Sequence, residues 1–133
     1  MYILDTNIIS YMMKGSTSIE NKLKVIDSDL VYITSITASE LLYGARKNKL
    51  KSHSLLQIYA ALFDQCEILD FDLASANEFS KIKSDLKLKG SIIEDADIQI
   101  ASIAKANNMI LVTDNNNEFK RIDGIIIENW SKE

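Results

Sequence analysis

Residues 94–114 constrain the fold more than any other part of the chain, because they join an apolar helix to a short strand. Apolar side chains lie three, four and seven positions after Asp97, so Asp97 itself begins the apolar stripe of this helix. Residues 110–113 (Ile-Leu-Val-Thr) then form a compact, mostly β-branched run, typical of a parallel strand buried on both faces. The segment therefore predicts half of a parallel βαβ unit, with Asp114 directly after its strand.

The two acids of this segment occupy informative positions. Asp97 points in the same direction as the apolar stripe, and a carboxylate placed there needs a compensating partner. The nearby N-terminus of the helix supplies part of that compensation through its dipole and free N–H groups. Asp114 stands at the carboxyl end of a strand, which is where open α/β sheets bind ligands. We therefore expect a functional site at this edge of the sheet.

Two further acids follow predicted strands elsewhere in the chain. Asp5 comes directly after the strand 2–4, and Glu40 lies in the first turn of the helix after the strand 30–36. Each has a purely structural alternative, since Asp5 can cap the next helix and Glu40 completes a Thr-x-x-Glu capping box with Thr37. The carboxyl ends of parallel strands nevertheless meet at one edge, so both acids are expected to face the same crevice as the first two.

The order of the predicted elements is that of one layered domain over residues 1–133. Strands are expected at residues 2–4, 30–36, 67–71, 110–113 and 125–130, with helices between them. This order predicts a three-layer α/β/α domain with a central, mainly parallel five-stranded sheet and right-handed crossovers. One boundary is left open: a Ser91-x-x-Glu94 capping box allows the central helix to begin at Ile92 or at Asp95.

Composition limits the function. The chain has 19 acidic and 15 basic residues, a formal net charge of −4, which argues against a general nucleic-acid-coating protein. Basic residues within 46–51 and 81–89 form either local phosphate-contacting patches or solvated helix faces. The apolar runs are too short for a membrane span and the first residues lack the basic start of a signal peptide, so we expect a cytoplasmic protein with no membrane partner.

Neither the single cysteine nor the single histidine suggests catalysis. Cys66 lies between an apolar helix and a strand, as a small buried side chain would, and His53 lies in a polar stretch. Trp130 is expected to pack at the sheet edge rather than to stack on a base. The chain also lacks the glycine-rich phosphate-binding motifs and any Ser-His-Asp or Cys-His pairing.

The four acids together predict a metal site. Two carboxylates about 4 Å apart repel by about 4 kcal/mol at an effective dielectric of about 20, so a cluster of Asp5, Glu40, Asp97 and Asp114 needs protons or cations. Hard oxygen ligands without His or Cys favour Mg²⁺ or Mn²⁺ over zinc. A site of this kind can activate water for attack on a phosphodiester.

With these residues assembled, the chain resembles the PIN-domain ribonucleases, in particular the VapC-type toxins of bacterial and archaeal toxin–antitoxin pairs. The segments that carry the resemblance are 4–7 (LDTN), 39–44 (SELLYG), 97–102 (DIQIAS), 111–114 (LVTD) and 128–130 (ENW). The resemblance implies an endoribonuclease that depends on Mg²⁺ or Mn²⁺. It implies Asp5, Glu40 and Asp97 as its metal-binding catalytic acids, with Asn7 and Thr113 as supporting residues.

The resemblance leaves the fourth acid open. We take Asp114 as the fourth catalytic and metal-binding acid, although in the family it can fall one residue later, where this chain has Asn115 as a supporting residue. Glu118 is a more distant alternative, and Asp95 competes with Asp97 but lacks the Asp-x-x-Ile-Ala spacing. The resemblance further implies an RNA substrate, a homodimer, and a cognate antitoxin that blocks the active site.

Two other classes of function fit parts of the pattern. A receiver-like signalling domain also places aspartates around Mg²⁺ at strand ends, although no convincing lysine follows the final strand to balance a phosphate. A non-catalytic binding module would keep the fold alone, which the intact set of acids argues against.

Overall fold

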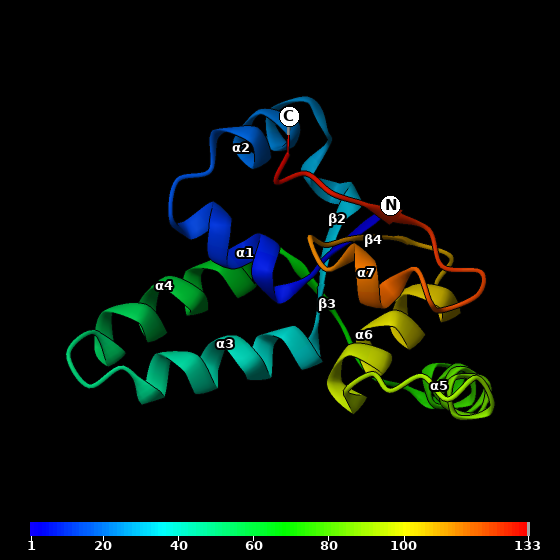
Figure 1. Ribbon diagram of the computed structural model, residues 1–133. Helices are drawn as coiled ribbons and strands as arrows, with labels where there is room; N and C mark the ends of the chain where they lie inside the picture. The colour runs from blue at the N-terminus through cyan, green and yellow to red at the C-terminus, as the bar shows by residue number, and fades with distance from the viewer. Residues whose placement is uncertain (133) are drawn as a thin grey trace.

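Five short parallel strands form the centre of the molecule, a computed structural model that describes residues 1–132 (Figure 1). The strands are β1 (Tyr2–Leu4), β2 (Val31–Thr34), β3 (Glu67–Leu69), β4 (Ile110–Val112) and β5 (Ile127–Glu128). Their order in the sheet is β3-β2-β1-β4-β5, and every neighbouring pair is parallel. The five-stranded sheet expected from the sequence is therefore confirmed, and in the described chain it is parallel throughout.

Helices fill the connections and cover both faces of this sheet. They are α1 (Thr6–Met13), α2 (Thr17–Val25), the 3₁₀ helix η1 (Ser28–Leu30), α3 (Ser35–Lys47), α4 (Ser52–Gln65), α5 (Leu73–Leu88), α6 (Asp95–Ala106) and α7 (Asn116–Phe119). One face carries α1 to α4, and the opposite face carries α5, α6 and α7 (Figure 1). The result is the predicted three-layer α/β/α arrangement. Within residues 1–132, no helix has the length and apolar character that crossing a bilayer requires.

The strands send alternate side chains into two separate cores. In β1, Ile3 packs with α5 and α6, whereas Leu4 packs with α1 to α4. In β4, Leu111 and Val112 divide between the same two cores in the same way, and all four side chains are buried. Because successive side chains of a strand point to opposite faces, burial on both faces requires an apolar residue at every position. This explains the uninterrupted apolar runs in the sequence.

The start of α3 differs from the sequence expectation. The helix begins at Ser35, and its N-cap is Thr34, whose side chain accepts a 3.1 Å hydrogen bond from the backbone N–H of Thr37. Thr37 is therefore inside the first turn, and the predicted Thr37–Glu40 capping box is wrong. The strand before it is correspondingly shorter than residues 30–36. This correction leaves Glu40 free of any capping role.

The start of α6 is also settled by the structure. The helix begins at Asp95, the later of the two positions that the sequence left open, and Glu94 occupies the N-cap position without a side-chain capping bond. Ser91 and Ile92 lie outside the helix. Asp97 consequently lies in the first turn, where the N-terminal N–H groups are unsatisfied and negative charge is favoured.

Candidate active site

Asp5 is the buried centre of the site. It follows β1 directly and is only 4% exposed. Its Oδ1 accepts a 2.8 Å hydrogen bond from the N–H of Thr6, so Asp5 caps α1 as one sequence interpretation proposed. Its Oδ2 accepts a 2.7 Å bond from the hydroxyl of Thr113 and a 3.2 Å bond from the side-chain amide of Asn7. Capping therefore uses only one of its oxygens, and the other joins β1 to the end of β4.

The electrostatic surroundings of Asp5 disfavour its charged form. Burial is the largest effect and raises the pKa of Asp5, and the carboxylates of Glu40 and Asp114 raise it further. Hydrogen bonds from Thr113 and Thr6 act in the opposite direction without cancelling the rise. A buried carboxylate near two other acids is stabilised in its ionised form by an added positive charge.

Glu40 reaches the site from the second turn of α3, one turn later than expected, because the helix begins at Ser35. Its Oε1 accepts a 2.7 Å hydrogen bond from the hydroxyl of Thr6, and the same hydroxyl lies 3.3 Å from that of the buried Thr37. Thr6 thus contacts Asp5 through its backbone and Glu40 through its side chain. Sequence reasoning missed this bridge, for which the only signal was the place of Thr6 between Asp5 and Asn7.

Asp97, which lies on α6, completes the set of three acids. Burial is the largest of the causes that together raise the pKa of Asp97 to about 7, and the carboxylates of Asp5, Glu118 and Glu40 supply the rest. These acids come from four separate elements and act on one another at one edge of the sheet. Asp95 does not take part, because its side chain is 60% exposed and forms a 2.8 Å ion pair with Lys83.

The structure places Asp114 on the α1 side of the site. Its Oδ2 accepts a 2.5 Å hydrogen bond from the hydroxyl of Tyr11, and its backbone N–H lies 3.4 Å from Oδ1 of Asn7. The bond to Asp114 raises the pKa of the Tyr11 hydroxyl, which therefore stays protonated as a donor. Asp114 acts electrostatically on Asp5, and it is not among the acids that raise the pKa of Asp97.

Glu118 approaches the site from α7, on the side of Asp97. Its carboxylate accepts a hydrogen bond from the side-chain amide of Asn115, and a more distant contact of 3.9 Å joins it to Arg121. The backbone N–H of Asn115 donates a 3.0 Å bond to the hydroxyl of Thr113. The sequence ranked Glu118 behind Asp114, whereas in the structure both acids approach the site, and Glu118 is the one beside Asp97.

The chemistry of this set fits a divalent cation. Within residues 1–132, no three acidic, histidine or cysteine side chains converge tightly enough to hold a metal ion as they stand. The acids are close enough, however, for repulsion to raise the pKa of both Asp5 and Asp97. Mg²⁺ and Mn²⁺ prefer a donor set that consists of negatively charged oxygen atoms alone, as this set of carboxylates does. His53 is exposed near the start of α4, and Cys66 is half-buried at the C-cap of the same helix. Neither side chain contributes to the donor set.

Comparison with known proteins agrees with this fold. The sequence profile of the PIN domain matches residues 2–125. The chain is 40% identical to ribonuclease VapC2 of Rickettsia felis over 99% of both chains, and 31% identical to the tRNA(fMet)-specific endonuclease VapC of Shigella flexneri over 98% of both. The structure of VapBC2 from Rickettsia felis, bound to a DNA fragment from its promoter, superposes with a TM-score of 0.90. The sequence identity between the two chains is 37%, and the match covers 97% of this chain and 98% of the Rickettsia felis chain.

These likenesses extend over nearly the whole length of the chain and include relatives above 30% identity. PIN-domain nucleases of the VapC type depend on divalent metal ions, and the all-oxygen donor set described above suits such an ion. The chain belongs to the PIN-domain family, and within it to the VapC-type ribonucleases.

Proposed function

We propose that this chain is the endoribonuclease toxin of a toxin–antitoxin pair and that it hydrolyses RNA phosphodiesters with Mg²⁺ or Mn²⁺. The observation that carries the proposal is the raised pKa of both Asp5 and Asp97 within one group of carboxylates at the carboxyl edge of a parallel sheet. Its relatives support the activity, since they are named ribonucleases and a tRNA-specific endonuclease. Their solved complexes are toxin–antitoxin assemblies, which supports a cognate antitoxin as partner.

Each acid has a distinct part in this proposal. Asp5, Glu40 and Asp97 hold the cation, which when bound acts as a Lewis acid and lowers the pKa of a water molecule. Thr113 and Asn7 fix the orientation of Asp5, and the hydroxyl of Thr6 fixes that of Glu40. With a pKa of about 7, Asp97 holds a proton on its carboxyl for much of the time in the metal-free protein at neutral pH.

The remaining acids adjust the charge at the two sides of the site. Asp114, proposed as the fourth catalytic and metal-binding acid, adds negative charge beside Asp5, and Glu118 adds it beside Asp97. We expect the antitoxin to inhibit by covering these acids, because a basic side chain placed among them would supply the positive charge that they lack. The homodimer stays a prediction.

The decisive test is the loss of activity on neutralising either central acid. Asp5→Asn and Asp97→Asn should abolish RNA cleavage in Mg²⁺ or Mn²⁺ and relieve growth inhibition on expression, while circular dichroism stays unchanged. Asp95→Asn is the matched control, since Asp95 lies two residues from Asp97 but pairs with Lys83 on the surface. Retained cleavage by both central variants would contradict the proposal.

The receiver-like alternative finds no support in the sheet. Receiver-type domains of the flavodoxin-like class have the strand order 2-1-3-4-5, whereas this sheet has the order 3-2-1-4-5. Incubation with a small phosphodonor provides an independent check. We expect no stable aspartyl phosphate on Asp5 or Asp114.

A further inference from the structure

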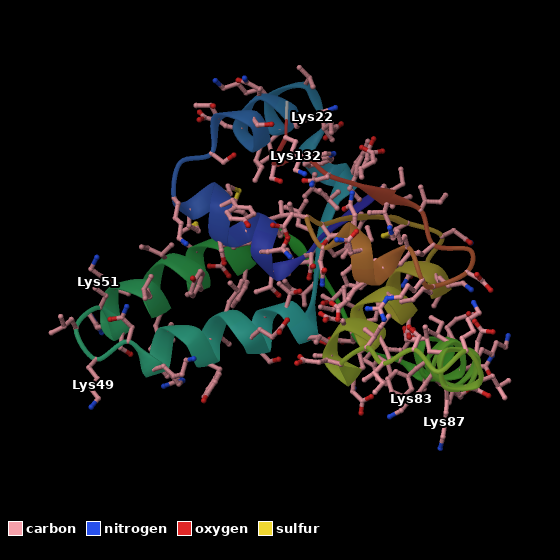
Figure 2. All side chains as sticks on the ribbon, in the orientation of Figure 1. Lys22, Lys49, Lys51, Lys83, Lys87 and Lys132 are labelled. Atoms are coloured by element: carbon pink, nitrogen blue, oxygen red, sulfur yellow. The ribbon has the colours of Figure 1, made fainter. Side chains whose placement is uncertain are left out.

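The two basic patches suggested by the sequence are not well placed to bind RNA near the acids. In residues 81–89 the lysines at 81, 83 and 89 are engaged in ion pairs with neighbouring acids. In residues 46–51, Lys49 and Lys51 lie at the far tip of the hairpin formed by α3 and α4 (Figure 2). Another surface is therefore better placed to supply groups that bind the substrate close to the acids.

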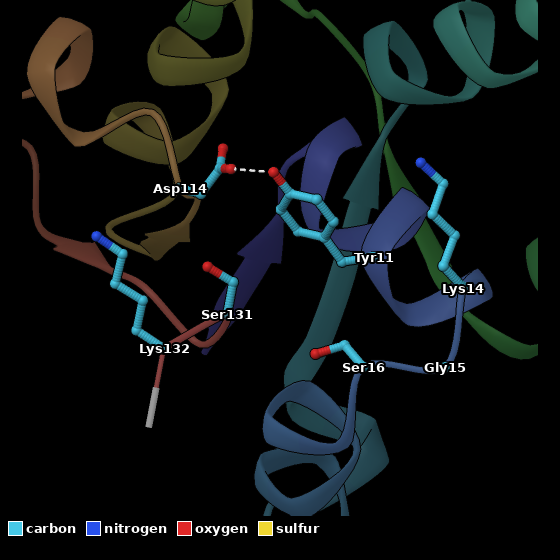
Figure 3. Close-up of a pocket in the computed structure, with 7 residues that line it drawn as sticks. All are labelled: Tyr11, Lys14, Gly15, Ser16, Asp114, Ser131 and Lys132. Atoms are coloured by element: carbon cyan, nitrogen blue, oxygen red, sulfur yellow. Dashed lines mark hydrogen bonds between the residues drawn. The ribbon is translucent and has the colours of Figure 1, made fainter.

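A polar depression beside Asp114 supplies such groups. It has a volume of about 560 Å³, and Tyr11, Lys14, Ser131 and Lys132 line it together with Asp114 (Figure 3). This volume lies within the range of about 300–1,000 Å³ that is usual for sites of small ligands. Its wall combines the end of α1, the segment after β4 and the C-terminal residues. The depression is thus built by parts of the chain far apart in sequence, and it adjoins the site directly.

Two lysines of this depression have no partner in the described chain. Neither Lys14 nor Lys132 forms an ion pair with a carboxylate among residues 1–132, and in the close-up they stand on opposite sides of Tyr11 (Figure 3). A second depression of about 500 Å³ shares Lys132 and adds Lys22. Lysines that form no ion pair with residues 1–132 therefore continue from Asp114 away from the acids, in the direction that a bound strand could follow. Phosphates are the natural partners of such lysines.

Tyr11 gives the depression a fixed aromatic surface. The residue is 36% exposed although it belongs to α1, and its hydroxyl is tied to Asp114 at 2.5 Å. The bond restrains the ring without covering it. An exposed, restrained ring beside lysines is the combination on which bases of single-stranded nucleic acids stack.

We propose that this depression is the subsite for a nucleotide next to the scissile phosphodiester of a single-stranded RNA, with its base on Tyr11 and its phosphates between Lys14 and Lys132. The proposal rests on the proposed nuclease function and adds to it the place where the RNA strand lies. It also explains how an acidic protein binds a polyanion next to a group of carboxylates. The two lysines offset the repulsion on the side of Asp114.

The test measures RNA binding separately from cleavage. Binding of a fluorescent single-stranded oligoribonucleotide is followed by anisotropy, in a chelator, over a range of salt concentrations. The double variant Lys14→Ala/Lys132→Ala should bind about tenfold more weakly. Its slope of log affinity against log salt should be smaller by about 1.4, because two phosphate contacts at about 0.7 each are lost. The matched control is Lys49→Ala/Lys51→Ala, which removes the same charge at the far tip and should leave both quantities unchanged.

Tyr11 is tested by a pair of variants that separate the ring from its hydroxyl. Tyr11→Leu should weaken binding about tenfold, within the range for loss of one stacked base. Tyr11→Phe keeps the ring and should bind nearly as well as the natural protein. Equal losses in both variants would show that only the bond to Asp114 matters, and would overturn the stacking role.

The outcomes also separate this proposal from the nuclease function. Suppose that the natural protein cleaves RNA and that the two double-lysine variants bind the oligoribonucleotide with the same affinity. The subsite is then overturned and the nuclease function stands. If the natural protein binds RNA through Lys14 and Lys132 but cleaves none with Mg²⁺ or Mn²⁺, the nuclease function is overturned and RNA binding at this depression stands.

Discussion

The hydroxyl of Thr113 donates a 2.7 Å hydrogen bond to Oδ2 of Asp5, and this bond joins the ends of the two central strands. The register of the sheet brings them together, since Leu4 pairs with Val112 and the N–H of Asp5 donates a 2.9 Å bond to the carbonyl of Val112. Thr113 is fully buried, so its hydroxyl cannot turn to water instead. The partner that orients the most buried acid of the site is therefore supplied by strand pairing.

Replacing Thr113 by valine tests this relationship. Thr113→Val keeps the shape of the side chain but removes the shorter of the two hydrogen bonds to a buried carboxylate oxygen, which should cost about 1–3 kcal/mol of unfolding free energy. Cleavage should fall about tenfold or more, as is usual when a residue that orients a metal ligand is lost. Urea unfolding and initial cleavage rates measure the two effects. Thr113→Ser, which keeps the hydroxyl, should retain most of both, and a fully active Thr113→Val would contradict the role.

The raised pKa of Asp97 predicts how stability depends on pH in the metal-free protein. Between its ordinary pKa of 3.8 and its folded value of about 7, the folded state binds more protons at Asp97 than the unfolded state does. The free energy of unfolding should therefore fall as pH rises through this interval, and the raised pKa of Asp5 acts in the same direction. Denaturant unfolding in a chelator from pH 5 to pH 8 measures the trend.

Asp97→Asn is the variant that checks the origin of this trend. Because asparagine does not titrate, the variant should lose much of the fall and be more stable than the natural protein at pH 8. Asp95→Asn serves as the control, since its exposed side chain pairs with Lys83. A natural protein whose stability rises from pH 5 to pH 8 would show that Asp97 is not in repulsive surroundings.

The two central strands, β1 and β4, could be predicted from the sequence because burial on both faces requires apolar residues at each of their positions. Boundaries were harder where two residues suit the same role. Thr34 and Thr37 are both good caps, and the β-branched Ile36 between them extends the apparent strand, so the sequence alone predicts a later start for α3 than the structure shows. Only the local backbone shows that Thr34 is the residue that caps.

The acids of the site could be singled out because each follows a strand or begins a helix, which are properties of local sequence. The polar side chains around them could not, because their roles depend on contacts between distant elements. Tyr11 reads as one more apolar position of a helix, and only its bond to Asp114 marks it as part of the site. Lys14 and Lys132 come from opposite ends of the chain, and no pattern in the sequence places them in one depression.

Cation binding should release protons from the site. Near neutral pH, Asp97 is partly protonated in the metal-free protein, and a bound cation requires its ionised form. The affinity for Mn²⁺ should therefore rise between pH 6 and pH 8, and calorimetry in two buffers of different ionisation enthalpy should detect the released proton. Removing the metal should leave the protein folded, because both hydrophobic cores consist of apolar side chains and none of the site acids belongs to them. An affinity that does not change with pH would contradict this mechanism.

The fourth acid can be identified by comparing Glu118→Gln with Asp114→Asn. Glu118→Gln should lower the pKa of Asp97 below about 7, because Glu118 is one of the acids that raise it, whereas Asp114→Asn should leave that pKa unchanged and lower the pKa of Asp5. Carboxyl-carbon NMR titration of the metal-free protein measures both values.

Both substitutions should weaken Mn²⁺ binding, and Glu118→Gln should do so more strongly, by about tenfold. The reason is that the charge of Asp114 is already partly satisfied by the hydroxyl of Tyr11, whereas Glu118 lies beside Asp97 and raises the pKa of Asp97 both by its charge and by a side-chain hydrogen bond. Asp95→Asn should change neither affinity nor pKa. A larger loss of affinity in Asp114→Asn would assign the fourth position to Asp114, the acid that directly follows the strand.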